Sequence, residues 1–395
     1  MATFHITNAN NNVPVDFSGD GDIYIVNTSV TMSVSGDNAF FGATAFTENT
    51  IQILGTVKTT TREPTIFIRG SEAFVQLGDA GRVASQSTAI WLTGPKGGVF
   101  NNGRIDAKDF GIKIENIESF VKNIDKITSD GTGIRIEGTG GEIENYGTIT
   151  AVVGVKGLSG AGDTLSLFNQ GTITGSQYSF NGSGANDTLL NQGSMVGDIY
   201  LLGGNDIFNN TGGTVNGTVF GGFGNDTYTV GDTSVVVEEV AGEGDDKVVA
   251  RISYILKTNI ETLSLSGNAD INGTGNGLSN KLAGNGGANT LKGAAGDDIL
   301  AGGQGNDKLV GGGGIDIFVF ANRMGKDRVT DFVPEGANHD IIDLGNVSAI
   351  TDFADLKANH LEKSGSDVVI FINNGDTITI EGVKINDLHA NDFLF

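Results

Sequence analysis

Apolar residues recur along the first half of the chain at a nearly constant interval. Consecutive members lie 20 to 24 residues apart, and four of them close the same phrase, Asn-x-Gly-x-apolar. A repeat of this length, built of short β-type segments between glycines, is typical of a parallel β-helix, in which each coil packs its aliphatic side chains on the next. The pattern predicts a β-helix over residues 81–220. The recurring positions are Val83, Ile105, Ile127, Ile149, Ile173, Met195 and Val215.

The asparagine of this phrase occurs at Asn101, Asn145, Asn169 and Asn191. Asparagine amides can stack and hydrogen-bond from coil to coil, and glycine lets the backbone turn at positive φ. We therefore expect these asparagines to be structural. A β-sandwich with a similar turn spacing is the alternative that the pattern leaves open.

A second and stricter pattern begins at residue 275. Five blocks of nine residues follow without a gap, each with Asp or Asn at the sixth position and Leu or Phe at the eighth. The first six residues of a block predict a loop whose glycines free carbonyl oxygens, and the last three predict a short strand with an inward apolar side chain. Isolated copies begin at Gly221 and Ala241, and Gly204–Phe208 is a half-copy.

The nine-residue period predicts metal sites at the loops. Successive loops alternate between two edges of a flattened coil, so Asp298 is expected beside Asp316, and Asn289 beside Asp307. Stacked carboxylates and carbonyls offer the roughly six to eight hard oxygen ligands that Ca²⁺ prefers, whereas Mg²⁺ demands a tighter octahedron. We predict several calcium ions, with weaker or capping sites where Asn replaces Asp. The expected metal-site residues are Asp206, Gly222, Gly224, Asp226, Asp246, Gly284, Gly286, Asn289, Gly293, Ala295, Asp298, Gly302, Gln304, Asp307, Gly311, Gly313 and Asp316.

The blocks match the phrase G-G-x-G-x-D-x-U-x, where U is a large apolar residue, and so resemble the RTX family of calcium-binding repeats. The segment after Phe320 resembles the tail domain that follows such repeats in serralysin-type and other type I-secreted proteins. This second resemblance covers Asp327-x-x-x-Asp331-Phe332, Asp340-x-x-Asp343-Leu344 and the terminal Asp392–Phe395. It implies export by type I secretion machinery that reads a C-terminal signal. A simple solenoid cap is equally compatible with the segment.

Charge and cysteine content narrow the possibilities further. The chain carries 47 Asp and Glu against 24 Lys and Arg, a net charge of −23, which attracts cations and repels nucleic acid and anionic lipid. It has no cysteine, so neither disulfides nor thiolate metal sites are expected, and bound metal is the expected staple. No apolar run approaches the roughly 18 residues of a membrane-spanning helix. We also expect no cleavable N-terminal signal peptide.

Two classes of enzyme are alternatives to a purely structural role. A zinc protease of the serralysin type needs a His-Glu-x-x-His helix, and the four histidines of this chain do not form that phrase. The Tyr-Gly-x-Asp-Pro-His phrase of alginate epimerases is also absent. Arg104, Arg135, Lys113 and Glu115 could line one face of the β-helix, but charges at strand ends are usually solvated. We therefore predict no catalytic residues, no organic cofactor and no enzyme.

The expected fold is all-β: a right-handed parallel β-helix or β-solenoid continuing into a calcium-bound parallel β-roll, with small β-rich caps at both ends. Residues 1–80 are expected to form an N-terminal β-rich cap or interaction module, and 81–220 the β-helix. Residues 221–320 are expected to form the RTX β-roll with an irregular insert at 247–274. Residues 321–395 are expected to combine a C-terminal cap with the type I secretion signal.

These expectations lead to a non-catalytic, secreted calcium-binding structural protein that self-assembles at the bacterial surface, as a surface layer or matrix fibre. The expected partners are further copies in an oligomer or lattice, cell-surface polysaccharide, and the export machinery, with no nucleic acid and no membrane span. A calcium-dependent adhesin or glycan-binding protein is the main alternative. A polysaccharide epimerase or lyase built on a β-helix is a weaker one.

Overall fold

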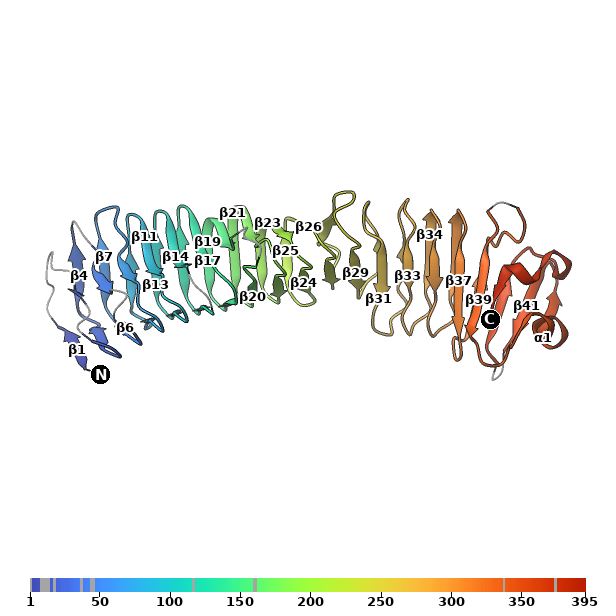
Figure 1. Cartoon of the computed structure of the whole chain (residues 1–395), viewed down its shortest axis with the longest axis horizontal. Helices are drawn as coiled ribbons and strands as arrows, with labels where there is room; N and C mark the ends of the chain where they lie inside the picture. Colours follow the sequence, from blue (N-terminus) through green and yellow to red (C-terminus); the bar gives the residue numbers. More distant parts are fainter. Residues whose placement is uncertain are drawn as a thin grey trace. The chain divides into compact units, whose positions relative to one another are not determined.

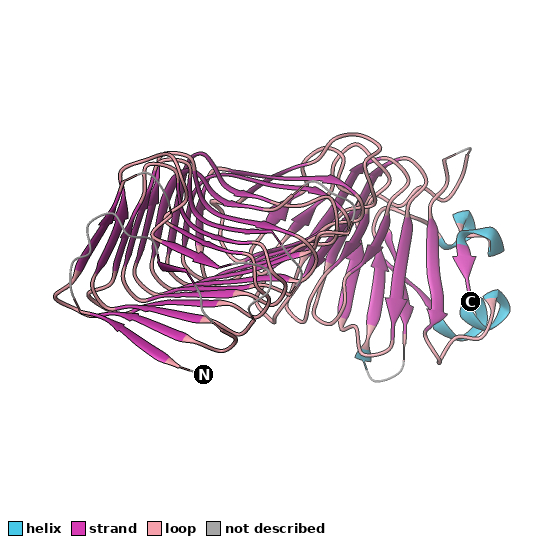
Figure 2. Cartoon of the chain, turned by 60° about the vertical axis from the view of Figure 1, so that its left-hand side comes forward, coloured by secondary structure: helices cyan, strands magenta, loops and turns pink. Residues whose placement is uncertain are grey.

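The computed structural model describes residues 2–7, 15–16, 19–35, 38–42, 47–115, 118–158, 162–336, 338–372 and 375–395. In this part of the chain the structure is all-β, with short helical segments only near the C-terminus (Figures 1 and 2). The chain divides into two compact units, Met1–Gly224 with Ser234–Val237, and Asn225–Thr233 with Glu238–Phe395. Each unit is a parallel β-solenoid, which confirms the predicted fold class. None of the described helices is long and apolar enough to cross a membrane.

The first unit has three rows of parallel strands. The first row contains β1 (Thr3–Ile6), β3 (Ile23–Val26), β6 (Thr50–Ile53), β9 (Phe74–Leu77), β12 (Gly98–Asn101), β15 (Phe120–Asn123), β18 (Gly141–Asn145), β20 (Leu165–Asn169), β22 (Thr188–Asn191) and β24 (Ile207–Asn210). The second contains β4 (Thr31–Val34), β7 (Thr56–Thr59), β10 (Arg82–Ala84), β13 (Arg104–Ala107), β16 (Lys126–Ser129) and β25 (Thr214–Asn216). The third contains β2 (Val15–Asp16), β5 (Phe40–Gly42), β8 (Ile66–Ile68), β11 (Thr88–Leu92), β14 (Phe110–Glu115), β17 (Thr132–Glu137) and β26 (Thr218–Phe223). In the later coils one long strand runs through both the second and the third row. These strands are β19 (Thr148–Lys156), β21 (Thr172–Asn181) and β23 (Ser194–Gly203).

The apolar residues that recur in the sequence lie on the inside of the second row. Val83 pairs with Ile105, Ile105 with Ile127, and Ile127 with Ile149, and all four are fully buried. The interval in the sequence is therefore the length of one coil. Because every coil repeats the register, each aliphatic side chain packs on its counterpart in the next coil.

The predicted asparagine ladder is present and lies inside the first unit. Asn101 Nδ2 donates to Asn123 Oδ1, Asn123 Nδ2 to Asn145 Oδ1, and Asn145 Nδ2 to Asn169 Oδ1, each at 2.7 Å. The row continues through Asn191. Each buried amide thus satisfies its neighbour and fixes the register of the coils. The alternative of a β-sandwich is excluded, because the strands are parallel and stacked coil on coil.

Residues 1–80, predicted to form a cap or interaction module, carry strands of the same rows. β3 pairs with β6, β6 with β9, and β9 with β12, all in parallel. Phe40 on β5 and Ile66 on β8 are fully buried, as expected for packed strands. The described residues of this segment are therefore coils of the solenoid.

The second unit has two rows of parallel strands (Figure 1). One row contains β27 (Thr227–Val230), β29 (Lys247–Ala250), β31 (Thr262–Leu265), β33 (Lys281–Ala283), β35 (Ile299–Ala301), β37 (Ile317–Ala321), β39 (Ile341–Asn346) and β43 (Phe393–Leu394). The other contains β30 (Tyr254–Ile255), β32 (Gly273–Thr274), β34 (Thr290–Ala295), β36 (Lys308–Gly313), β38 (Lys326–Val329) and β42 (Thr377–Ile380). A further strand, β28 (Val236–Glu238), contains residues of both units.

The nine-residue blocks form the centre of this second solenoid. Leu282 pairs with Leu300 and Leu300 with Phe318, while Leu291 pairs with Leu309. All five side chains are buried. Strands two blocks apart are therefore neighbours, so the loops that precede them stack as predicted.

One prediction about this region needs correction. Residues 247–274 were expected to be an irregular insert, but β29 and β31 lead into β33, and β30 and β32 lead into β34. The segment lacks the glycine phrase yet keeps inward residues such as Val248 and Leu263, which are fully buried. Apolar alternation alone is sufficient to keep these strands in the rows.

The C-terminal segment extends both rows and then closes them. β38 and β39 each add one strand in parallel. β42 pairs in parallel with β38 and antiparallel with β41 (Asp367–Phe371), which pairs with β40 (Leu361–Ser364). Helical turns precede the hairpin at α1 (Phe353–Asp355) and a π-helix (Leu356–His360), and 3₁₀ turns follow it at Ile385–Asp387 and Ala390–Asp392.

Candidate calcium sites

In the blocks that begin at Gly302 and Gly311, the loops turn through positive φ at their second and fourth positions. Gly303 and Gly305 have φ of +95° and +129°, and Gly312 and Gly314 have φ of +109° and +135°. L-residues rarely adopt this conformation, which explains the glycines. Close stacking is a second reason, since a Cβ added to Gly314 would lie 2.1 Å from the Gly296 carbonyl oxygen.

Glycine occupies the first position of the blocks at 293 and 302 because a Cβ there would collide with the side chain at the sixth position of the same block. A Cβ on Gly293 would lie 2.1 Å from Asp298 Oδ2 and 2.4 Å from the Gly311 carbonyl oxygen. On Gly302 it would lie 2.3 Å from Asp307 Oδ2. At Gly293 the missing Cβ therefore leaves space next to two oxygens, Oδ2 of Asp298 and the carbonyl oxygen of Gly311.

The sixth-position carboxylates form two hydrogen-bonded ladders. Asp298 Oδ1 accepts from the Asn280 amide at 2.7 Å, and Asp316 Oδ1 accepts from the Asp298 amide at 3.0 Å. On the other edge, Asp307 Oδ1 accepts from the Asn289 amide at 2.7 Å. The predicted stacking of Asp298 beside Asp316, and of Asn289 beside Asp307, is confirmed.

The second carboxylate oxygen of these aspartates is the feature that fits a cation. Asp298, Asp307 and Asp316 are at most 1% exposed, and their Oδ2 atoms have no hydrogen-bond partner among the described residues. A buried carboxylate oxygen without a partner is costly. A Ca²⁺ ion prefers such hard oxygens together with backbone carbonyls, so the residues present fit calcium.

Without a cation the ladders hold protons more tightly than usual. Burial raises the pKa of Asp298 to about 7 and outweighs the lowering effect of the hydrogen bond from Asn280, and the charge of Asp316 adds a smaller rise. Burial likewise raises the pKa of Asp307 and of Asp316 to about 6. Ionised carboxylates at neutral pH thus need a compensating positive charge.

Asn289 behaves differently from the aspartates. Its Oδ1 accepts from the Asn285 amide at 2.9 Å, and its Nδ2 donates to the Ile271 carbonyl oxygen at 2.6 Å. The side chain closes its own loop without a cation. The expectation that blocks with Asn give weaker or capping sites stays a prediction.

The ladders extend beyond the residues expected from the sequence. Asp327 Oδ1 accepts from the Asp307 amide at 2.9 Å, and Asp340 Oδ1 accepts from the Asp316 amide at 3.0 Å. Asp331 accepts from the amides of Gly311 and Gly312. These aspartates were noted only as part of the tail resemblance, because Asp327 and Asp340 each keep only one glycine of the block phrase, Gly325 and Gly336 respectively.

A cluster of buried carboxylates lies at the start of the second unit. Asp246 Oδ1 accepts from the Asp226 amide at 2.8 Å, and carboxylate oxygens of Asp226, Glu239 and Asp246 lie within 4.8 Å of one another. The Tyr228 hydroxyl bonds to Asp226 Oδ2 at 3.2 Å and to Glu239. The two aspartates were predicted, but Glu239 lies outside the nine-residue phrase and gave no signal.

The first unit contains the same type of loop near its end. Gly222 and Gly224 have φ of +103° and +117°, and a Cβ on Gly224 would lie 1.8 Å from the Gly204 carbonyl oxygen. Asp206 Oδ1 accepts from the Asp187 amide at 2.6 Å. Asp187 was missed, although residues 182–190 read GSGANDTLL, with Asp at the sixth position and Leu at the eighth.

The remaining expected residues lie in the same loops. A Cβ on Gly284 would lie 2.0 Å from the Gly302 carbonyl oxygen and 2.5 Å from Asn289 Oδ1, so this site repeats the geometry at Gly293. The carbonyl ligands at third positions stay a prediction. They are Gly286, Ala295, Gln304 and Gly313.

Three of the four charged residues that could line a face lie together, and Arg104 lies apart. Arg104 on β13 pairs with Asp106 at 2.7 Å. Lys113 on β14 pairs with Glu115 and lies 4.0 Å from Glu137, which pairs with Arg135 at 2.5 Å. Lys113, Glu115 and Arg135 thus belong to one ion-pair network in which each charge has an opposite partner, whereas Arg104 lies in another row.

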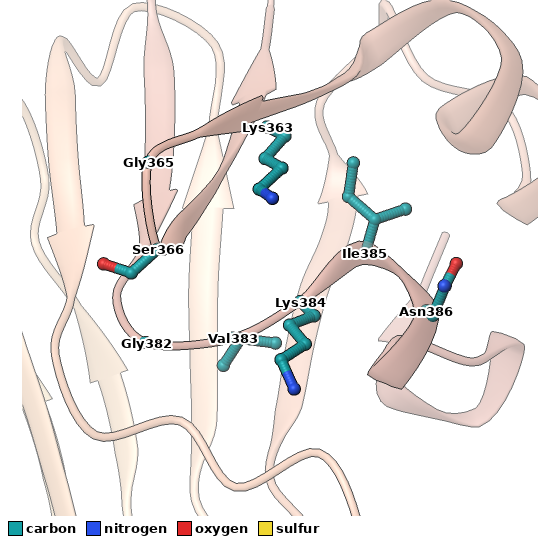
Figure 3. Close-up of a pocket in the computed structure, with 8 residues that line it drawn as sticks. All are labelled: Lys363, Gly365, Ser366, Gly382, Val383, Lys384, Ile385 and Asn386. Atoms are coloured by element: carbon teal, nitrogen blue, oxygen red, sulfur yellow. The ribbon is translucent and has the colours of Figure 1, made fainter.

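A cavity of about 510 Å³ in the C-terminal segment lies apart from all the expected calcium residues (Figure 3). Lys363 from β40 and Lys384 from the stretch after β42 line it, together with Val383 and Ile385. Two ammonium groups repel a cation. The cavity is therefore unsuited to calcium.

Comparison with known proteins identifies the loops. Residues 283–318 match the family model of the RTX calcium-binding nonapeptide repeat (4 copies), and these repeats bind calcium, which is therefore the cofactor. No curated protein matches the chain.

Among 32 solved chains that match, the AlgE6R3 subunit of the Azotobacter vinelandii mannuronan C5-epimerase is 24% identical with a TM-score of 0.25, over 36% of this chain and 83% of its own. The extracellular lipase LipA of Serratia marcescens is 16% identical with a TM-score of 0.22, over 59% of this chain and 45% of its own. TM-scores this low carry no argument about function.

Proposed function

We propose that the chain is a secreted, non-catalytic structural protein that folds around calcium at the bacterial surface. In this proposal it assembles with further copies into a surface layer or matrix fibre. The observation that carries the calcium part is the set of buried, unpartnered Oδ2 atoms of Asp298, Asp307 and Asp316. Most described residues of each unit belong to solenoid strands and the loops that join them, which suits a scaffold.

Calcium-dependent folding suits export through a narrow channel. Extracellular calcium modules bind with dissociation constants of roughly 10⁻⁴–10⁻³ M, so the sites would stay empty in cytosol, where calcium is scarce. Ionised aspartates stacked without calcium repel one another, and the chain would remain threadable until it reaches the outside. Residues 321–395 would then serve as both cap and type I secretion signal.

Assembly is supported by large apolar side chains that stay exposed in both units, such as Phe223 at 67% in the first and Ile255 at 68% in the second. Exposed apolar surface that is not needed within one chain is available to another copy.

Light scattering and electron microscopy of the purified full chain test the assembly step. With about 10 mM calcium, in excess over extracellular-class sites, we expect ordered particles larger than one chain. Chelation should disperse them, and magnesium at the same concentration should not restore them. A chain that stays monomeric at every calcium concentration would refute self-assembly and leave the calcium sites untouched.

A calcium-dependent adhesin or glycan-binding protein is the second candidate, favoured by an aromatic row on the first unit. Ring centroids of Phe67 and Trp91 are 4.7 Å apart, and Phe41 lies 5.9 Å from Phe67. Lys113 Nζ lies 4.3 Å from the centre of the Trp91 ring. Phe41 and Trp91 are half-buried on either side of the buried Phe67, and partly exposed rings are suited to stacking on sugars. Monomeric particles that bind glycan in the experiment above would favour this candidate.

A further inference from the structure

A hollow on the first unit has the properties of a second, calcium-independent site. It lies beside the ends of β7 and β10, and consists of two adjoining parts of about 630 Å³ and 390 Å³. Thr60, Gln86 and Lys108 line both parts, so the two form one continuous groove. None of the expected calcium residues lines it.

The groove is richer in basic side chains than the chain as a whole, since four basic and three acidic side chains line it. Lys58, Arg62, Arg82 and Lys108 line it, although acids outnumber bases by 47 to 24 in the whole sequence. Arg82 pairs with Asp106 at 2.9 Å, and Lys108 with Asp130 at 2.6 Å. Lys58 and Arg62 are exposed and have no ion pair within the described ranges. The side chains of Lys58 and Arg62 are therefore available to bind an external anion.

A row of basic side chains continues along the solenoid beside the groove. Arg82 pairs in register with Arg104, and Arg104 with Lys126, on three successive coils. Neighbouring strands are only about 4.8 Å apart, and like charges directly opposite each other destabilise a sheet. Asp106 offsets the two arginines, but Lys126 has no ion pair in the described part of the chain. A local cost of this kind is expected where a surface serves binding.

The groove also offers uncharged polar groups. Thr60 lines both parts, Thr61 lines one part and Thr128 the other. Gln86 adds an amide, and Asp109 a carboxylate. A ligand that suits this mixture must carry negative charge and many hydroxyl groups.

We propose that this groove binds an acidic polysaccharide, with Lys58 and Arg62 as the residues that contact its anionic groups. A linear polyanion laid along the axis meets a cation on each successive coil. Nucleic acid fits less well, because Asp106, Asp109 and Asp130 lie between the cations and repel closely spaced phosphates. Their carboxylates can instead accept hydrogen bonds from sugar hydroxyls. The inference does not depend on self-assembly.

Isothermal titration calorimetry on the calcium-loaded full chain tests the proposal, with hyaluronan oligosaccharides as the acidic probe and dextran as the neutral one. We expect hyaluronan to bind, dextran to bind more weakly or not at all, and binding to weaken as NaCl rises from about 0.05 M to about 0.5 M. The variant Lys58→Ala/Arg62→Ala should bind at least about tenfold more weakly.

The matched control is Arg251→Ala/Lys257→Ala, which removes one exposed arginine and one exposed lysine of the second unit and should bind like the unaltered chain. Unchanged calorimetric affinity of Lys58→Ala/Arg62→Ala would overturn the assignment of the groove. Absence of hyaluronan binding, or equally tight binding of double-stranded DNA, would overturn the ligand class.

Discussion

The aspartate at the sixth position of each block has a different task for each carboxylate oxygen. Oδ1 of Asp316 accepts from the backbone of the neighbouring loop, and Oδ2 has no partner in the described structure. The asparagine at position 289 uses both side-chain atoms within the protein. The two residue types therefore differ in their demand for a cation. The loops differ as well, because Gly303 and Gly305 before Asp307 have positive φ, whereas the loop before Asn289 closes on its own side chain.

Neutralising one ladder should raise the calcium needed for folding. In Asp298→Asn/Asp316→Asn the amide oxygens can still accept the backbone hydrogen bonds, but the charge that holds calcium is lost. We expect the calcium midpoint of folding, followed by circular dichroism, to rise about tenfold or more. The control Glu63→Gln/Glu142→Gln makes the same charge change at exposed, unpaired residues, and an equal rise there would point to net charge instead.

The calcium-free chain should be more stable in mild acid than at neutral pH. Folded-state pKa values of about 7 for Asp298 and about 6 for Asp316 lie above the unfolded value of about 3.9. The folded state therefore binds more protons, and its stability falls as the pH rises from about 4 to about 7. Thermal melts of calcium-free protein at about pH 5 and about pH 7.5 measure this, and a higher melting temperature at the higher pH would contradict it.

At the scale of strands and loops, the repeating residues were predictable and the exceptions were not. The 22-residue interval between Ile105 and Ile127 equals one coil, and the nine-residue phrase implied the contact between Asp298 and Asp316. Asp340 extends a ladder without the glycine phrase, since strand pairing alone brings it there. Glu239 reaches its cluster through the path of a loop, which a periodic pattern does not encode.

The asparagine ladder should contribute measurably to the stability of the first unit. Asn145→Ala removes the bonds to Asn123 and Asn169 and leaves buried polar groups unpaired, which costs about 1–3 kcal/mol. Urea unfolding with calcium present should show this loss. The control Gln170→Ala removes an exposed amide ladder contact and should change the free energy of unfolding by less than about 0.5 kcal/mol. Equal effects would argue against a special role for the buried row.

At the scale of the whole molecule, the two solenoid units are stabilised by different means. The first buries amides that satisfy one another from Asn101 onward. The second buries carboxylates such as Asp307, whose Oδ2 has no partner in the described residues. Calcium should therefore matter more to the second unit than to the first.

Removal of calcium should loosen the units unequally. In hydrogen exchange followed by mass spectrometry, chelation should speed exchange in residues 275–336 far more than in residues 98–115 and 118–158, because only the former depend on calcium to offset buried charge. Equal acceleration in both regions would mean that the first unit also requires calcium. No acceleration in either region would mean that the aspartate ladders are stable without calcium.

The central claim is that calcium builds the second solenoid, and circular dichroism during a calcium titration from zero to about 10 mM tests it most directly. The account predicts that the β signal grows cooperatively as calcium is added, is lost on chelation, and is not restored by magnesium. A full β signal in calcium-free solution at neutral pH, unchanged by calcium, would contradict it.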